Sequence, residues 1–257
     1  MDTVVVTGGR EAVRQQIVTF VASVTRVEGD VIGRWRDHIC PMVVGLTDPQ
    51  AQFVQRRLVD VQNTVRKFKE AVNKTCAPNL FVIITDEAEQ VLTSWKSRDP
   101  GMFRWKTRDG VSRSNGDGPV RAWHNAIMEP SDGAPPSLND GQPPGFKLKP
   151  SRIESSAAEN IRAVVVLVDT RAAGSVTLSQ IADYIAMVSL AQLDLTANLG
   201  GVNSILRLFA EPRPATPPTA LTDWDLAFLN GLYRTSYTPI NQRRDIAARM
   251  ARALAPR

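Results

Sequence analysis

The sequence predicts an α/β protein, with α+β character, in which helices pack on a mixed sheet. Two runs, Leu80 to Thr85 and Val164 to Val168, have the continuous apolar composition of strands that are covered on both faces. Elsewhere apolar residues recur at steps of three and four, which is typical of amphipathic helices. With 257 residues, of which 43% are hydrophobic and 22% charged, the chain is long enough to bury a core.

Residues 1–97 are predicted to form the N-terminal α/β half of a single domain. The β-branched run that ends at Gly8-Gly9 favours a strand, and Asp48-Pro49 supplies an N-cap and a first-turn proline for a long helix. The expected strands are 4–7, 42–46 and 80–85, and the expected helices are 13–24, 48–73 and 86–97.

Residues 98–151 are predicted to be an irregular insert, rich in glycine and proline, with one short alternating piece near Val120 to Ala126. Such an insert can cover the sheet or form part of a site. Regular structure resumes in residues 152–257, with a strand at 164–168 and helices at 177–193, from Thr222 onwards and at 240–254.

The helix at 177–193 is apolar around its whole circumference, which is typical of a central, buried helix. Its only charged side chain is Asp183, and a buried carboxylate without a partner is strongly unfavourable. Arginine is the expected partner, because 24 of the 31 basic residues are Arg and the guanidinium meets a carboxylate at two points. The alternative is that Asp183 lines a pocket as an acid or a base.

The sequence offers little for catalysis or metal binding. It has two histidines, two cysteines and none of the common phosphate-binding, nucleophile-elbow or zinc-helix motifs. No metal and no cofactor are therefore expected, and enzymatic activity is disfavoured without being excluded. Among the histidines, His124 beside Trp123 is the better candidate for a general base; its alternative is a partly buried structural residue.

The formal net charge of +5 is modest and predicts solubility more than nucleic-acid binding. No basic stripe with interleaved aromatics is present, and the arginines of the last fifteen residues read best as a solvated helix face. No membrane-spanning segment is expected. The sequence does not identify a binding partner, and a protein or a peptide is the candidate.

The layout of the C-terminal part resembles a known fold family. A strand at 164–168, a buried helix at 177–193, the segment Asn203 to Leu206 and a Leu-Thr-x-x-Asp helix from Leu221 resemble the catalytic half of zincin-like metalloproteases. More narrowly, the pieces Ile39-Cys40-Pro41 and Cys76-Ala77-Pro78-Asn79-Leu80 are similar to those of uncharacterised secreted alphaproteobacterial proteins.

This resemblance implies a zincin-like half at 152–257 that lacks the HExxH zinc motif. Asp183, Tyr184 and Met187 stand where the two histidines and the glutamate would be, so zinc-peptidase activity is not expected. Two cysteines alone fit either a disulfide or two buried thiols, and the resemblance favours a Cys40–Cys76 disulfide. It also favours a periplasmic or secreted location with the signal peptide absent from this chain; the alternative is cytoplasmic.

Two functional hypotheses follow. The first is a non-catalytic envelope or secreted protein with a degenerate metalloprotease-like fold, used for binding or structure. The alternative is a hydrolase with an unrecognised site near His124 and Asp183.

Overall fold

The computed structural model describes residues 3–25, 31–66, 75–98, 106–107, 110–111, 118–130, 157–235 and 239–255. Its helices are α1 (Thr3–Val24), α2 (Asp48–Arg66), α3 (Ala88–Arg98), α4 (Thr170–Ala173), α5 (Leu178–Leu190), the 3-10 helix η2 (Ile205–Phe209), α6 (Asp223–Arg234) and α7 (Pro239–Ala253). Its strands are β1 (Arg34–Trp35), β2 (Pro41–Val44), β3 (Leu80–Thr85), β4 (Lys106–Thr107), β5 (Gly110–Val111), β6 (Val120–Pro130) and β7 (Ala157–Asp169).

Strand β7 organises the main sheet. On one edge it pairs in parallel with β1 near its start and with β3 near its end, and β3 in turn pairs in parallel with β2. On its other edge β7 pairs with β6, which runs antiparallel and places Trp123 opposite Val165. The sheet is therefore mixed, as predicted, and it joins strands from all three predicted parts of the chain.

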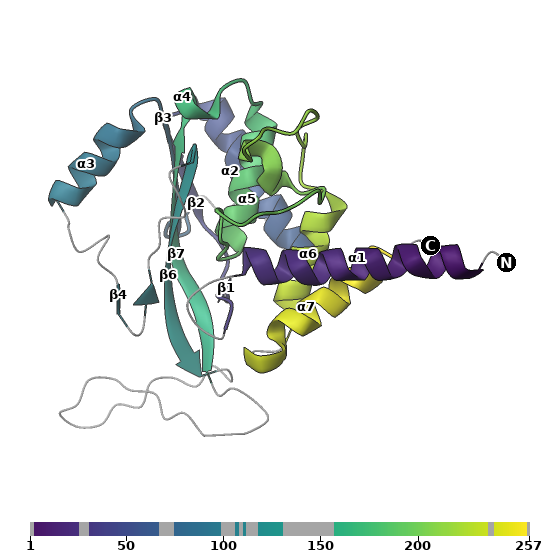
Figure 1. The fold of residues 1–257 in the computed structure, drawn as a ribbon. Coiled ribbons are helices and arrows are strands. Elements are labelled where there is room, and N and C mark those ends of the chain that lie inside the picture. The colour runs from purple at the N-terminus through teal and green to yellow at the C-terminus, as the bar shows by residue number, and fades with distance from the viewer. Residues whose placement is uncertain are drawn as a thin grey trace, which may run out of the picture.

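Helices cover the two faces of this sheet unequally (Figure 1). Helices α2, α5 and α6 lie on one face with α1 and α7 beyond them, and α3 lies alone on the other face. The main core fills the first interface, and a small cluster of Ala88, Leu92, Trp123 and Leu167 fills the second. β7 is thus covered on both faces, which explains its continuous apolar run.

Helix α5 is the centre of the main core. Thr177 caps it, because its side chain accepts from the Gln180 amide while Gln180 Oε1 accepts from the Thr177 amide. Every residue from Ile181 to Leu190 is buried. The prediction of a helix that is buried on all sides is confirmed, although the helix ends at Leu190, where the chain becomes extended and Ala191 pairs with Arg34.

One element of the sequence prediction is wrong. Residues 4–7 form part of α1 instead of a strand, and Gly8-Gly9 continue the helix. Ile17, Phe20, Val21 and Val24 anchor the second half of α1 in the core. Extending a packed helix is far easier than nucleating one, whereas a strand at 4–7 would need an edge to pair with, so tertiary packing overrides the β-propensity of the valines.

Most of the remaining predicted elements lie close to the observed ones, but β7 begins seven residues before the strand predicted at 164–168. β3 has the predicted bounds, and the alternating piece in the insert is the start of the eleven-residue strand β6. The long helix from Asp48 is described as far as Arg66, and its predicted end near Asn73 lies outside the described residues, as does most of the insert. None of the helices in the described part of the chain is long and apolar enough to span a membrane.

The predicted disulfide is confirmed. Cys40 and Cys76 are bonded, with their Cα atoms 6.0 Å apart. The bridge links the residue before β2 to the loop before β3, and the Asn79 side chain adds bonds to the Cys40 amide at 2.6 Å and the His38 carbonyl at 2.8 Å. His38 lies in the loop between β1 and β2.

Candidate binding cleft

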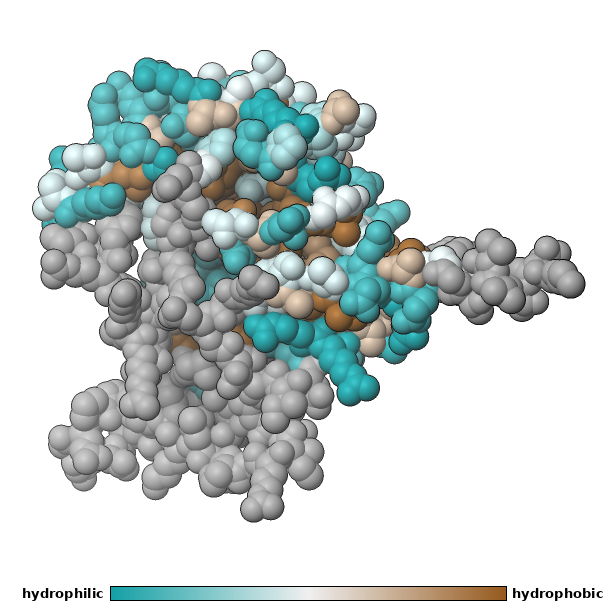
Figure 2. All heavy atoms as spheres, viewed as in Figure 1, coloured by the Kyte–Doolittle hydropathy of each residue, from teal (hydrophilic) through white to brown (hydrophobic). Residues whose placement is uncertain are grey.

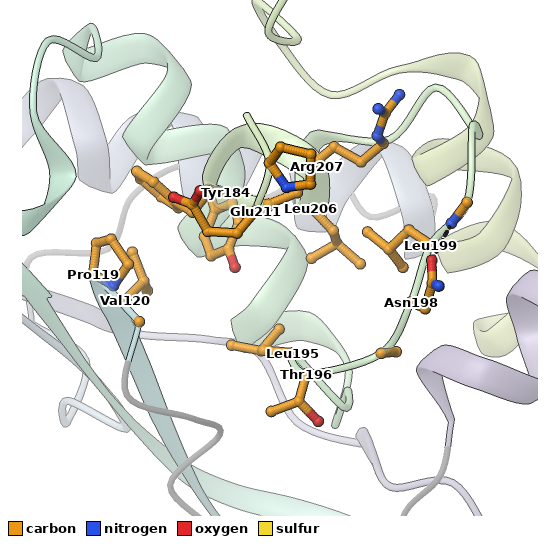
Figure 3. A pocket seen from close by; sticks show the side chains of 16 residues that line it. Pro119, Val120, Tyr184, Leu195, Thr196, Asn198, Leu199, Leu206, Arg207 and Glu211 are labelled. Carbon is orange, nitrogen blue, oxygen red and sulfur yellow. Dashed lines mark hydrogen bonds between the residues drawn. The ribbon is translucent and has the colours of Figure 1, made fainter. Parts of the chain in front are cut away.

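A cleft of about 680 Å³ opens beside α5, between the start of β6 and the loops that follow α5. Figure 3 shows its wall: Pro119 and Val120 on one side, Tyr184, Leu206 and Glu211 along the top, and Leu195, Thr196 and Leu199 opposite. In the space-filling view, hydrophobic residues lie at the centre of this face, surrounded by hydrophilic ones (Figure 2). The volume is within the range of small-molecule and cofactor sites.

Local hydrogen bonds hold the first loop of the cleft, residues 194–200. Asp194 accepts from the amide of Thr196 at 2.9 Å and from its hydroxyl at 2.6 Å, and Asn198 accepts from the amide of Gly200 at 2.9 Å. Such Asx bonds replace the ladder bonds that the chain lacks here. Gly200 has φ +59°, so the turn that closes this loop uses the left-handed region.

The second loop is anchored by a buried carboxylate. Asp225 completes the capping box of α6 with Thr222, and its oxygens also accept from the Ser204 hydroxyl at 2.6 Å and the Ile205 amide at 2.8 Å. Asp225 therefore fixes the start of η2 against α6. Burial raises the pKa of Asp225, while these hydrogen bonds oppose that shift. The carboxylate thus serves as part of the helix cap.

Tyr184 lines the cleft from α5. Its side chain is held edge-on against Phe209, with ring centroids 4.9 Å apart, and only 5% of the residue is exposed. The hydroxyl group points into the cavity in Figure 3 and has no hydrogen-bond partner among the described residues. Burial raises the pKa of Tyr184, so the phenol stays protonated and is a neutral hydrogen-bond donor.

The described cleft residues carry little charge. Besides Tyr184, the ionisable ones are Arg207 and Glu211, whose charges cancel, and the Arg207 guanidinium points away from the centre of the cavity (Figure 3). The described lining contains no histidine, cysteine, serine or aspartate. Its hydroxyl and carboxylate groups are those of Thr196, Tyr184 and Glu211.

Asp183, the neighbour of Tyr184, faces α2 instead of the cleft. Arg57 meets it in a bidentate pair, Nε to Oδ1 and Nη2 to Oδ2, the latter at 3.0 Å. The Leu221 amide donates to Oδ2 at 2.8 Å, and the Asp183 side chain is completely buried. The hydrogen bond to Asp183 raises the pKa of Arg57 further above its usual value. The predicted buried pairing with an arginine is confirmed.

His124 lies on β6 and is buried against α5. Its Nε2 is 2.9 Å from the carbonyl oxygen of Val188; since that oxygen can only accept, Nε2 carries the proton. Burial lowers the pKa of His124 to about 4, so the ring is neutral at physiological pH. His124 thus binds the helix backbone at Val188, whereas Asp183 binds Arg57, and the two side chains have separate partners.

Of the three positions at which the zincin resemblance would place metal ligands and base, only Tyr184 lines the cleft. Met187 is completely buried in the core, and Asp183 is bound to Arg57. Within the described ranges, no group of three or more His, Cys, Asp or Glu side chains lies close enough to hold a metal ion.

Sequence reasoning identified Tyr184 but missed the residues that complete the cleft, such as Phe209, Leu199 and Pro119. Phe209 is the last residue of η2, Leu199 lies in the loop after α5, and Pro119 directly precedes β6, so only the tertiary structure brings them together. The one local signal was Gly200-Gly201, which marks a tight turn.

No protein-family model, curated protein or solved structure matches this chain.

Proposed function

We propose that this protein is a non-catalytic binding protein of the periplasm or the extracellular space, and that the cleft beside α5 is its ligand site. The observation that carries the proposal is the lining of the cleft, which combines aliphatic and aromatic side chains with polar groups, among them one unpartnered, inward-pointing hydroxyl on Tyr184. Binding sites typically combine apolar walls with a few convergent polar groups.

The side chains that a hydrolase would use support the same proposal. His124 and Asp183 are the strongest acid–base candidates of the sequence, and both are bound to neighbouring elements of the fold. In this proposal the domain is a degenerate metalloprotease-like fold, with Asp183, Tyr184 and Met187 in place of the zinc-binding motif. A protein or a peptide segment is the partner we favour.

The Cys40–Cys76 disulfide supports an oxidising compartment, because structural disulfides are rare in cytosolic proteins. Expression of the chain with and without export to the periplasm, followed by mass spectrometry of unreduced peptides, tests this part. We expect the bridge to form fully only in the exported protein.

A fragment screen by ligand-observed NMR tests binding at the cleft. We expect binders that are lost in Thr196→Trp, which fills the cleft from its rim, and kept in Thr93→Trp, an exposed threonine on α3 on the other face of the sheet. The same preparations are assayed against peptide and ester substrates. Turnover that disappears in His124→Gln and Asp183→Asn variants that remain folded would overturn the proposal in favour of a hydrolase.

A further inference from the structure

We propose that the cleft beside α5 selects an uncharged ligand with an apolar body, and that the Tyr184 hydroxyl donates a hydrogen bond to a carbonyl-type oxygen of that ligand. This inference rests on the proposed function of the cleft and specifies the chemistry that the cleft recognises.

The hydroxyl of Tyr184 is built into the cleft rather than left on a surface. The edge-on contact with Phe209 fixes the ring, and the residue is 5% exposed, so the hydroxyl cannot turn into bulk solvent. No described residue accepts its proton. A buried polar group that lacks a protein partner normally has another one, and here the open side is the cleft.

The protonation state of Tyr184 defines the role of this group. Because burial keeps the phenol protonated, the group offers one donor to the cleft. A phenol hydroxyl is a strong donor and a weaker acceptor, because its oxygen lone pair is partly delocalised into the ring, so the best complementary ligand atom is an acceptor, such as an amide or ketone oxygen.

The charges of the described lining favour an uncharged ligand. A charge that enters the cleft loses part of its hydration and needs an opposite charge to compensate for the loss. Arg207 turns away from the centre of the cavity (Figure 3), and Glu211, which lies near Tyr184, is exposed, so water screens its charge; together the two side chains give the described lining no net charge.

The walls define the apolar part of the ligand. Val120, Leu195 and Leu206 come from three different segments and surround the space in front of the Tyr184 hydroxyl (Figure 3). A ligand with an aliphatic or aromatic group next to its carbonyl would cover these side chains while it accepts the hydrogen bond.

Three probes of one shape test the inference: N-acetyl-leucine methylamide, which is neutral, N-acetyl-leucine, which carries a carboxylate, and leucine methylamide, which carries an ammonium group. Binding is measured by chemical-shift titration of the intact chain. We expect the neutral probe to bind most tightly, with its shifts concentrated on residues 195–200 and 206–212.

The hydroxyl is then tested with Tyr184→Phe, which keeps the ring and removes no hydrogen bond within the described structure. We expect affinity for the neutral probe to fall about three- to tenfold, the effect of one uncharged hydrogen bond, with the melting temperature unchanged. Tyr233→Phe is the matched control: its hydroxyl donates to the Leu190 carbonyl at 2.7 Å, so this change affects stability and leaves probe affinity unaltered.

Equal affinity of the parent and Tyr184→Phe for the neutral probe, or tighter binding of either charged probe, would overturn the inference and leave a binding cleft of other specificity. Absence of binding by all three probes would also overturn it. Failure of the proposed function is a separate result, in which the fragment screen yields no binder that Thr196→Trp abolishes.

Discussion

At the scale of single residues, this protein uses its buried ionisable groups to join elements. Asp183 connects α5 to α2 through Arg57, Asp225 connects α6 to η2, and His124 connects β6 to α5. Each of these groups is buried and hydrogen-bonded, as such groups must be to avoid a large desolvation penalty. The sequence revealed that Asp183 needed a cationic partner, but not that Arg57, 126 residues away, would provide it, because that requires knowledge of how α2 docks.

The Asp183–Arg57 pair gives the first prediction. Asp183→Asn removes the charge partner of Arg57, whose side chain is 37% exposed, and weakens the charged hydrogen bonds at the fully buried Asp183, so we expect the free energy of unfolding to fall by about 1.5–3 kcal/mol. Urea unfolding measures this loss. Asp245→Asn, which breaks a half-exposed pair with Arg249 on one helix, should change it by less than about 1 kcal/mol. An Asp183→Asn protein as stable as its parent would contradict the structural role of this carboxylate.

Glu159 differs from these acids, because it is only partly buried and has no hydrogen-bond or ion-pair partner among the described residues. An added Cβ at Gly33 would lie 3.0 Å from Gln192 Oε1 and 3.6 Å from Glu159 Cδ, so both side chains pack over this glycine. Gln192 Oε1 is buried and has no partner in the described structure. Burial raises the pKa of Glu159 to about 7. Below pH 7 the protonated carboxyl group therefore predominates, and it places no negative charge beside the buried acceptor Gln192 Oε1.

At the scale of elements, local sequence signals succeeded where one element satisfies itself. The capping boxes at Thr177 and Thr222 begin α5 and α6 at the expected residues. The same local reasoning failed at residues 4–7, because the outcome there depends on a helix that is anchored ten residues further on.

A pair of glycine substitutions tests the helical conformation of residues 4–9 in α1. Gly9 is exposed in the helix, and a Cβ added there would have no atom within 4 Å, so Gly9→Ala should raise the free energy of unfolding by about 0.5–1 kcal/mol. Gly200→Ala, also in open space but at positive φ, should lower it. Chemical denaturation compares the two. A loss of stability in Gly9→Ala would favour a turn at Gly8-Gly9, as the sequence had suggested.

The disulfide gives a second prediction at this scale. It spans 36 positions and closes the connection that contains β2 and α2. The chain-entropy relation predicts that its loss reduces the free energy of unfolding by about 3 to 4 kcal/mol. Denaturation with and without reductant measures this difference in the parent. The Cys40→Ala, Cys76→Ala double variant should match the reduced parent and show no response to reductant.

At the scale of the whole molecule, one sheet collects strands from distant parts of the chain, and the cleft forms at its margin. The fold class was predictable because strand and helix periodicity is local. The cleft was not, because Val120, Tyr184 and Phe209 meet only after β6 has paired with β7 and η2 has docked on α5. Its position depends on contacts between elements, which no single stretch of sequence encodes.

The dependence of stability on pH is a property of the whole fold, and two buried groups should shape it in opposite directions. His124 has a pKa of about 4 in the folded protein, against 6.5 when exposed, so the unfolded chain binds the extra proton and stability is lost as pH falls from 6.5 to 4. Glu159 has a pKa of about 7, against 4.5, so the folded protein keeps the proton and stability is lost as pH rises from 4.5 to 7.

Single variants should separate these two contributions in urea unfolding from pH 4 to pH 8. Relative to the parent, Glu159→Gln should gain stability as pH rises, by about 2 kcal/mol at pH 8 after allowance for its partial contact with water. His124→Gln keeps an amide donor for the Val188 carbonyl and should gain stability, relative to the parent, as pH falls below 6.5. Taking differences from the parent cancels the titration of the other carboxylates. If the Glu159→Gln difference stays flat across this range, the pKa of Glu159 is the same in the folded and the unfolded protein, and the carboxylate ionises at neutral pH without a cost in stability.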